Sequence, residues 1–174
     1  MATRTAYENA WIRVREDQVI RPDGQPGLYG VVEVRSPAVF VVPVTAAGEV
    51  VLVEVDRYAT GGRSWEVPAG GSDGEDLLVA ARRELLEETG LVAAEWTALA
   101  QVQSLNGVAN APGRVFLARD LHAAEGAERE VEGITAQRSV SLPELVAMIS
   151  RGEISDNETL GALLVALVEL GRVG

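Results

Sequence analysis

The sequence predicts an α/β sandwich, and three features of its 174 residues lead to that fold class. The first half contains β-rich runs separated by turns, a strongly helical segment follows, and further strand-like runs precede two helical patterns near the end. No internal repeat, low-complexity tract or Pro/Ser-rich linker interrupts this order. A chain of this length with 47% hydrophobic residues can bury one sizeable core, so we expect one compact unit.

Two pairs of strands are expected in the first half of the chain. Trp11–Val19 and Leu28–Val34 flank a turn rich in Pro and Gly, at residues 21–27, and should pair with each other. Ala38–Val44 and Val50–Val55 are joined by a short turn that contains a glycine. This second arrangement predicts a hairpin.

A helix is expected over Glu75–Thr89, where Ala, Leu, Arg and Glu predominate, and it should end at Gly90, a natural helix terminator. Trp96–Ser104 and Arg114–Ala118 return to a strand-like composition. The remaining predicted elements are two loops, Leu105–Gly113 and Ala123–Gly133, and two helices, from Ser141 to Ser150 and from about Asn157 to Leu170.

The composition excludes several kinds of chemistry. The chain has no cysteine, which rules out disulfides, thiolate nucleophiles and thiolate zinc sites together. Its single histidine, His122, cannot form a multi-histidine metal site, and we expect it to be an incidental surface residue. Any enzymatic chemistry should therefore rely on carboxylates, which favour hard cations such as Mg²⁺ or Mn²⁺.

The formal net charge of −11 argues against binding of duplex nucleic acid, whose phosphates attract basic surfaces. Small phosphorylated substrates are compatible with this charge where bound cations reverse the local field. The first residues, up to Ile12, show no secretory signal, and the apolar stretch Leu160–Val168 is shorter than the roughly 20 residues that cross a bilayer. We therefore expect a soluble, cytoplasmic protein with no membrane partner.

Three carboxylates of the predicted central helix should share one face. On a helix that turns by about 100° per residue, Glu84, Glu87 and Glu88 fall within an arc of about 100°. Like charges at these spacings destabilise a helix by about 0.2–0.5 kcal/mol per pair, so a cation is expected beside them. The alternative is a solvated acidic face, which is common on surface helices.

A glycine-rich loop, Trp65–Gly74, leads into this helix and allows close approach of the backbone to a ligand. The loop is not a nucleotide P-loop, because no Gly-Lys-Ser/Thr follows, and it lacks the dinucleotide-binding fingerprint. A backbone carbonyl from this loop is a plausible additional ligand for a cation.

The order of these residues resembles the signature box of the Nudix hydrolases. The matching segment runs from Gly70 through Glu75 to the string Arg83-Glu84-Leu85-Leu86-Glu87-Glu88-Thr89-Gly90-Leu91. The family pattern places five residues between its first Gly and first Glu, whereas four separate Gly70 from Glu75. Either the loop is one residue shorter here, or Ala69 replaces that glycine; the helical part keeps the family spacing.

Within the family, the chain is most similar to the ADP-ribose pyrophosphatase branch. Leu52–Tyr58 resembles a strand of that branch that ends in a substrate-contacting arginine, here Arg57, and Trp65–Gly70 resembles the segment that leads into its box. The Ser-Pro-Gly element typical of the branch is replaced by Ser104-Leu-Asn-Gly-Val-Ala-Asn. The resemblance implies an α/β/α sandwich with a mixed sheet, preceded by an N-terminal antiparallel strand pair.

The resemblance also implies roles for individual residues. Glu84 and Glu88 would coordinate metal with the Ala69 carbonyl, and Glu87 would hold a further metal or its waters. Arg83 would orient the neighbouring carboxylates, and Glu84 counts among the catalytic residues. The residues expected to be structural in the motif are Gly70, Glu75, Arg83 and Gly90.

A later loop of the branch supplies a catalytic glutamate and another metal ligand. The segment Glu130-Val-Glu132-Gly-Ile resembles that spacing, so Glu130 is assigned as the base and Glu132 as the ligand. Glu128 is the nearest competitor for the role of base. A solvated charged loop is the alternative for all three residues.

The function implied by the resemblance is Mg²⁺-dependent, or Mn²⁺-dependent, hydrolysis of the pyrophosphate bond of a nucleoside diphosphate linked to another group. ADP-ribose or a nucleoside diphosphate sugar is the expected substrate, and a nucleoside monophosphate and a sugar phosphate are the products. Residues 1–36 would support a homodimer and contribute to its substrate sites, and residues 37–174 would form the Nudix domain. The alternatives are a non-catalytic nucleotide sensor and an enzyme for nucleoside triphosphates or dinucleoside polyphosphates.

Overall fold

Strand β4 (Ala38–Pro43) is the centre of the core in the computed structural model, which describes residues 2–172. It pairs in parallel with β10 (Pro112–Ala123) and antiparallel with β7 (Ala69–Gly71). β10 in turn pairs antiparallel with β8 (Leu91–Gln103), which gives the order β7-β4-β10-β8. This sheet is mixed, as predicted.

A second sheet is formed by β11 (Ile134–Val140), β5 (Val50–Arg57) and β6 (Gly62–Glu66), in that order and with antiparallel pairing. The predicted hairpin between Ala38–Val44 and Val50–Val55 is therefore wrong. β4 and β5 belong to different sheets and meet only at one bridge, between Val44 and Val50. The physical reason is that β7 and β10 already occupy both edges of β4, so no edge is left for β5.

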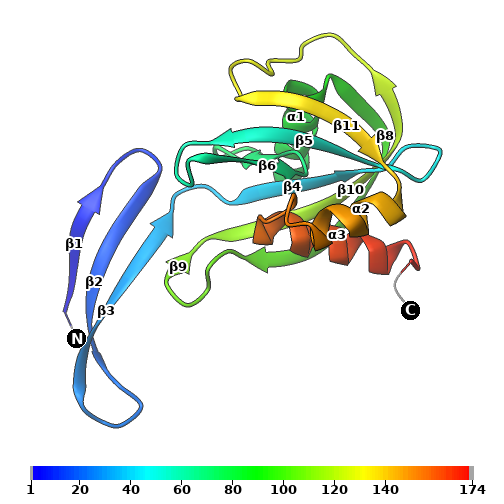
Figure 1. Cartoon of the computed structure of the whole chain (residues 1–174). Coiled ribbons are helices and arrows are strands. Elements are labelled where there is room, and N and C mark those ends of the chain that lie inside the picture. The colour runs from blue at the N-terminus through cyan, green and yellow to red at the C-terminus, as the bar shows by residue number, and fades with distance from the viewer. Residues whose placement is uncertain (1, 173–174) are drawn as a thin grey trace.

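The helices lie on opposite faces of the mixed sheet, with α1 (Leu77–Thr89) behind it and α2 (Leu142–Ser150) and α3 (Asn157–Glu169) in front (Figure 1). α1 begins two residues later than predicted, because the side chain of Asp76 accepts hydrogen bonds from the first turn and caps it. It ends as predicted at Gly90, whose φ of 70° is the left-handed conformation that favours glycine.

The alternation of side chains along β4 explains the two helical layers. Val39 and Val41 are fully buried on the face that packs against α1, together with Leu85. Phe40 and Val42 point the other way and join the larger core cluster, which contains residues of α2 and α3. Because successive side chains of a strand point to opposite faces, a strand that is apolar throughout has to be covered on both sides.

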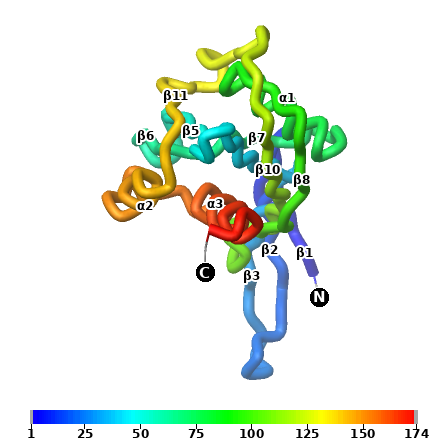
Figure 2. The backbone as a smooth tube through the Cα atoms, turned by 90° about the vertical axis from the view of Figure 1, so that its right-hand side faces the viewer, coloured from blue at the N-terminus to red at the C-terminus, as the bar shows by residue number. Residues whose placement is uncertain are grey.

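An N-terminal arm extends away from this sandwich (Figures 1 and 2). It consists of β1 (Thr3–Glu8), β2 (Ile12–Ile20) and β3 (Pro26–Val34), which pair antiparallel in that order, and β3 also pairs with the short strand β9 (Ala109–Asn110). The predicted strand pair is thus confirmed and is extended by β1. β1 was not predicted because all six of its residues are exposed and no apolar alternation marks it.

Among residues 2–172, no helix is long and apolar enough to cross a bilayer. His122 lies on the surface, as expected, with its side chain 61% exposed beside Asp120.

The packing of the core predicts that two leucine-to-alanine substitutions lower the free energy of unfolding by very different amounts. Leu52 is fully buried among the side chains that join β5 to the helices, so Leu52→Ala should lower the free energy of unfolding by about 2–5 kcal/mol. Leu164, on the outer side of α3, is 56% exposed, and Leu164→Ala should change it by less than about 0.5 kcal/mol. Urea denaturation of both variants measures the difference, and equal effects would contradict this description of the core.

Candidate active site

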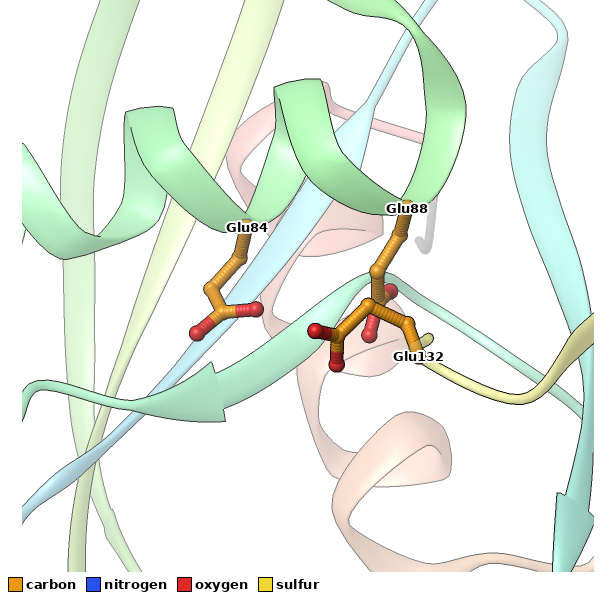
Figure 3. A group of neighbouring side chains, drawn as sticks. All are labelled: Glu84, Glu88 and Glu132. Atoms are coloured by element: carbon orange, nitrogen blue, oxygen red, sulfur yellow. The ribbon is translucent and has the colours of Figure 1, made fainter. Parts of the chain in front are cut away.

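Helix α1 and the loop before β11 bring three carboxylates together. Glu84 and Glu88 are one turn apart on α1, are only 4% and 5% exposed, and point toward Glu132 (Figure 3). One carboxylate oxygen of each residue lies within 4.8 Å of the others. We call Glu84, Glu88 and Glu132 the carboxylate triad.

Strand β7 packs so closely against the triad that a side chain at Gly70 is excluded. A Cβ atom added to Gly70 would lie 2.6 Å from Oε2 of Glu84 and nearer still to its other carboxylate oxygen. The backbone amide of Ala69 donates a hydrogen bond to Oε2 of Glu88 at 3.3 Å. The glycine of the signature is thus needed at position 70, where the backbone covers a carboxylate, even though the spacing to Glu75 is one residue short.

Arg83 connects the start of α1, the glycine-rich loop and the triad. Its guanidinium donates to Glu75 at 3.1 Å, to Glu84 at 2.8 Å, to Glu87 at 2.9 Å and to the backbone oxygen of Gly71 at 2.8 Å. Glu87 therefore contacts Arg83 and lies outside the triad. The structure brings Glu84 and Glu88 together with Glu132, whereas the expected grouping on one helix face was Glu84, Glu87 and Glu88.

Burial changes the protonation of the two members of the triad that lie on α1. Burial raises the pKa of Glu84 to about 7, against the opposing effect of the Arg83 charge, and the charges of Glu87 and Glu132 add to the rise. Burial likewise raises the pKa of Glu88 to about 8, and the charge of Glu84 raises it further. Two buried carboxyls that resist ionisation, with a carboxylate oxygen of Glu132 beside them, fit a hard divalent cation, which would supply the missing positive charge.

Arg57 lies at the end of β5 beside the triad. Its Nε and Nη2 atoms donate to the two carboxylate oxygens of Glu66 at 3.1 and 2.5 Å. Glu66 is 4% exposed, whereas about half of the Arg57 side chain is accessible. Arg57 also lines a cavity of about 1010 Å³. Glu66 was not among the predicted site residues, although its place directly after Trp65, in the segment that leads into the signature box, was a signal.

The loop between β10 and β11 places its three glutamates differently. Glu132 belongs to the triad, and its amide donates to the backbone oxygen of Glu128 at 3.1 Å. The Glu128 amide donates to the backbone oxygen of Glu87 at 2.8 Å, which attaches the loop to the end of α1. Glu130 is exposed and is not a member of the triad.

Comparisons with known proteins agree with this geometry. The chain matches the NUDIX domain family over residues 34–160 and the nucleoside diphosphate sugar hydrolase N-terminal domain over residues 2–32. It is 32% identical to an ADP-ribose pyrophosphatase of Mycobacterium tuberculosis, covering 98% of this chain and 84% of that protein. It is 29% identical to an ADP-ribose pyrophosphatase of Bacillus subtilis, covering 94% and 89%.

The fold is shared with a solved structure. The crystal structure of an ADP compounds hydrolase superposes with a TM-score of 0.85 and 21% identity, covering 99% of this chain and 95% of that chain. Fold, triad and family matches together define a metal-dependent hydrolase. The chain belongs to the Nudix family.

The raised pKa values predict how pH affects the stability of the cation-free protein. The pKa values of Glu84 and Glu88 lie above their ordinary value of 4.5, so the folded state favours the protonated carboxyls. Their contribution to stability is fully present below about pH 4.5 and is lost as the pH rises through 7 to 8. Without divalent cations, the melting temperature should therefore fall by several degrees between pH 5.5 and 8.5.

Glu88→Gln removes one of the two titrating groups and should make this fall smaller, whereas Glu169→Gln, at an exposed position of α3, should leave it unchanged. Adding Mg²⁺ should stabilise the unaltered protein most at the alkaline end. Thermal melts in a chelating buffer measure these differences. The same slope in all three proteins would contradict the assignment of the raised pKa values to this pair.

Proposed function

We propose that this chain hydrolyses the pyrophosphate bond of a nucleoside diphosphate sugar, with ADP-ribose as the first candidate and Mg²⁺, or alternatively Mn²⁺, as the cofactor. The observation that carries the proposal is the carboxylate triad, in which Glu84 and Glu88 are buried, beside an arginine and a cavity of about 1010 Å³. The names of the two pyrophosphatase relatives and the match of the N-terminal arm to a nucleoside diphosphate sugar hydrolase domain support the substrate class.

The residues of this chain have separate tasks in the proposed reaction. The triad and the Ala69 carbonyl would hold the cation, and Glu87, at the more exposed edge of α1, would hold a further one. A bound divalent cation neutralises the charge of a diphosphate and lowers the pKa of a coordinated water. Arg83 keeps the Glu84 carboxylate in position, and Arg57 offers a positive charge to the phosphates.

Glu130 is the proposed general base. It follows Glu128, whose amide is attached to α1, and precedes Glu132 of the triad by two residues, so a small movement of this exposed loop would bring it to the site. Its carboxylate takes a proton from water while the water oxygen bonds to phosphorus. The bridging P–O bond breaks, and ADP-ribose would give AMP and ribose 5-phosphate.

A substrate panel tests the activity itself. Purified protein with Mg²⁺ or Mn²⁺ should release products from ADP-ribose with many turnovers. No cleavage of any nucleoside diphosphate derivative would remove the proposal, and tight binding without turnover would indicate a sensor. Faster cleavage of nucleoside triphosphates or dinucleoside polyphosphates would assign the enzyme to those substrates instead.

Substitutions of Glu130 and Glu132 distinguish the general base from the metal ligand. Glu130→Gln should lower kcat by about 10²–10⁴-fold without changing the Mg²⁺ concentration needed for half-maximal activity. Glu132→Gln should raise that Mg²⁺ concentration, and Glu88→Gln should remove most activity, because each replaces a triad carboxylate with a neutral amide. Steady-state assays measure both quantities, with Glu125→Gln as a control in the same loop. An unaffected kcat in Glu130→Gln would transfer the role of base to Glu128 or Glu132.

The N-terminal arm is the proposed dimer contact. It exposes large apolar side chains, including Trp11 at 74%, Ile20 at 60% and Leu28 at 67%. Three strands that extend from the body without a covering layer cannot bury a core of their own, so a second copy of the chain is the proposed cover. The matched model of this arm as a separate domain, over residues 2–32, supports a role distinct from that of the sandwich.

Leu28→Glu should convert the proposed dimer to a monomer, because a buried unpaired charge opposes association. Val168→Glu, on α3 at 59% exposure, adds the same charge away from the arm and should leave the dimer intact. Sedimentation velocity distinguishes the states. A monomeric unaltered protein at micromolar concentration would refute this contact, and equal activity of dimer and monomer would remove the arm from the substrate site.

A further inference from the structure

The cavity beside Arg57 lies between the ends of the two sheets, and the start of α3 forms one of its walls. Its walls come from the β5–β6 turn, the end of β8 with the following loop, and the first turns of α3. Gly161 lies inside α3 and lines this cavity. A glycine within a helix destabilises it relative to alanine, so its presence calls for a reason.

Neither backbone strain nor close packing explains Gly161. Its φ is outside the left-handed region, and a Cβ atom added there would meet nothing within 4 Å. Gly62, on the β6 side of the same cavity, is likewise free of neighbours at its Cβ position. Both glycines therefore leave space that a side chain would fill, and this space belongs to the cavity.

The polar groups of the cavity suit hydroxyls. Asp156 caps α3 by accepting a hydrogen bond from the Thr159 amide at 2.7 Å, and the carboxyl of Glu158 lines the same cavity. Ser104, at the end of β8, adds a hydroxyl to the lining. On the β6 side, the buried Oγ of Ser64 has no hydrogen-bond partner within the described part of the chain. Among the described residues that line the cavity, none is aromatic, so it offers no stacking surface for a base.

Arg57 joins this cavity to the triad. It lines the cavity, and its pKa is raised mainly by the hydrogen bond with Glu66, with smaller contributions from the negative charges of Glu88 and Asp156. If cations at the triad and Arg57 hold the diphosphate, the group attached to that diphosphate would therefore point toward Asp156. A polyhydroxylated group fits there better than a nucleobase.

We propose that this cavity binds the sugar attached to the diphosphate, and that Gly161 determines how large a sugar is accepted. The inference rests on the proposed function and adds the location and size limit of the sugar. At about 1010 Å³ the cavity is at the upper end of ligand pockets, which span about 300–1,000 Å³, so a hexose fits as well as a pentose. Asp156 and Glu158 accept hydrogen bonds from its hydroxyls.

Two non-hydrolysable probes separate binding of the sugar from turnover. α,β-Methylene ADP-ribose carries the sugar and α,β-methylene ADP does not, and calorimetry with Mg²⁺ measures the Kd of each. Gly161→Leu should weaken binding of the first at least tenfold and leave that of the second within twofold. Glu169→Leu, which adds the same side chain to an exposed position of α3, should change neither.

Several outcomes would overturn the inference: equal affinity of the unaltered protein for both probes, no effect of Gly161→Leu on the first, or equal weakening of both. Absence of hydrolysis with retained discrimination between the probes would instead remove only the proposed function. If Gly161→Leu fails to fold, Gly161→Ala serves, because alanine favours the helix and should raise the melting temperature.

Gly161→Ala also tests the size limit in the active enzyme. Its kcat/KM for ADP-glucose relative to ADP-ribose should fall at least threefold, mainly through KM, because the larger sugar meets the added methyl group first. An unchanged ratio would overturn the role of Gly161 in setting the size of the sugar. Asp156→Asn, which keeps the helix cap but removes the charge, should raise KM for both substrates; unchanged KM values would remove Asp156 from the sugar site.

Discussion

Two carboxylates packed side by side out of water are the constraint on which the site depends. Glu84 and Glu88 are almost fully buried, and Arg83 donates a hydrogen bond only to the first of them. Two adjacent buried charges of the same sign are unstable unless a proton or a cation compensates them. The cation-free protein responds by favouring protons, as the raised pKa values show. The same oxygens are thereby prepared for a divalent cation.

The arrangement of the sheets follows from the need to keep Glu84 and Glu88 buried. β7 has to approach α1 closely enough for Gly70 to cover Glu84, and it does so by occupying one edge of β4. With β10 on the other edge, β5 is directed into a second sheet. The cavity lies between the ends of the two sheets, and Arg57 stands at the end of β5 where it lines that cavity. The placement of β7 and β10 on the two edges of β4 thus accounts both for the burial of the carboxylates and for the position of the open substrate pocket.

Local sequence predicted the elements whose signals are local. α1 was recognisable from its helix formers and from Gly90, and the strand pair of the arm from the turn at residues 21–27. The hairpin of β4 and β5 was predicted wrongly because a turn shows that the chain reverses but not which strands take each edge. β1 escaped notice because an exposed strand carries no apolar alternation.

The residues of the candidate site were predictable from the sequence to about the same extent as the helices and strands. Glu84 and Glu88 follow from helical spacing, whereas the assignment among Glu128, Glu130 and Glu132 depends on the path of a loop, which spacing does not determine. The pairing of Arg57 with Glu66 and the contribution of α3 to the cavity join segments far apart in the chain. No local pattern contains that information, since the contacts exist only after the sheets have packed.

The charges around the triad and the cavity determine the order in which cations and the diphosphate bind. Around the triad, Arg83 faces several glutamates, and in the cavity Arg57 is already paired with Glu66 and lies near Asp156. A diphosphate would meet a negative field there, in a chain whose formal net charge is −11. Cations therefore have to bind before or with the diphosphate, since the arginines are largely compensated by carboxylates of the protein. Substrate affinity should then depend on cation concentration as strongly as turnover does, because both require the same reversal of charge.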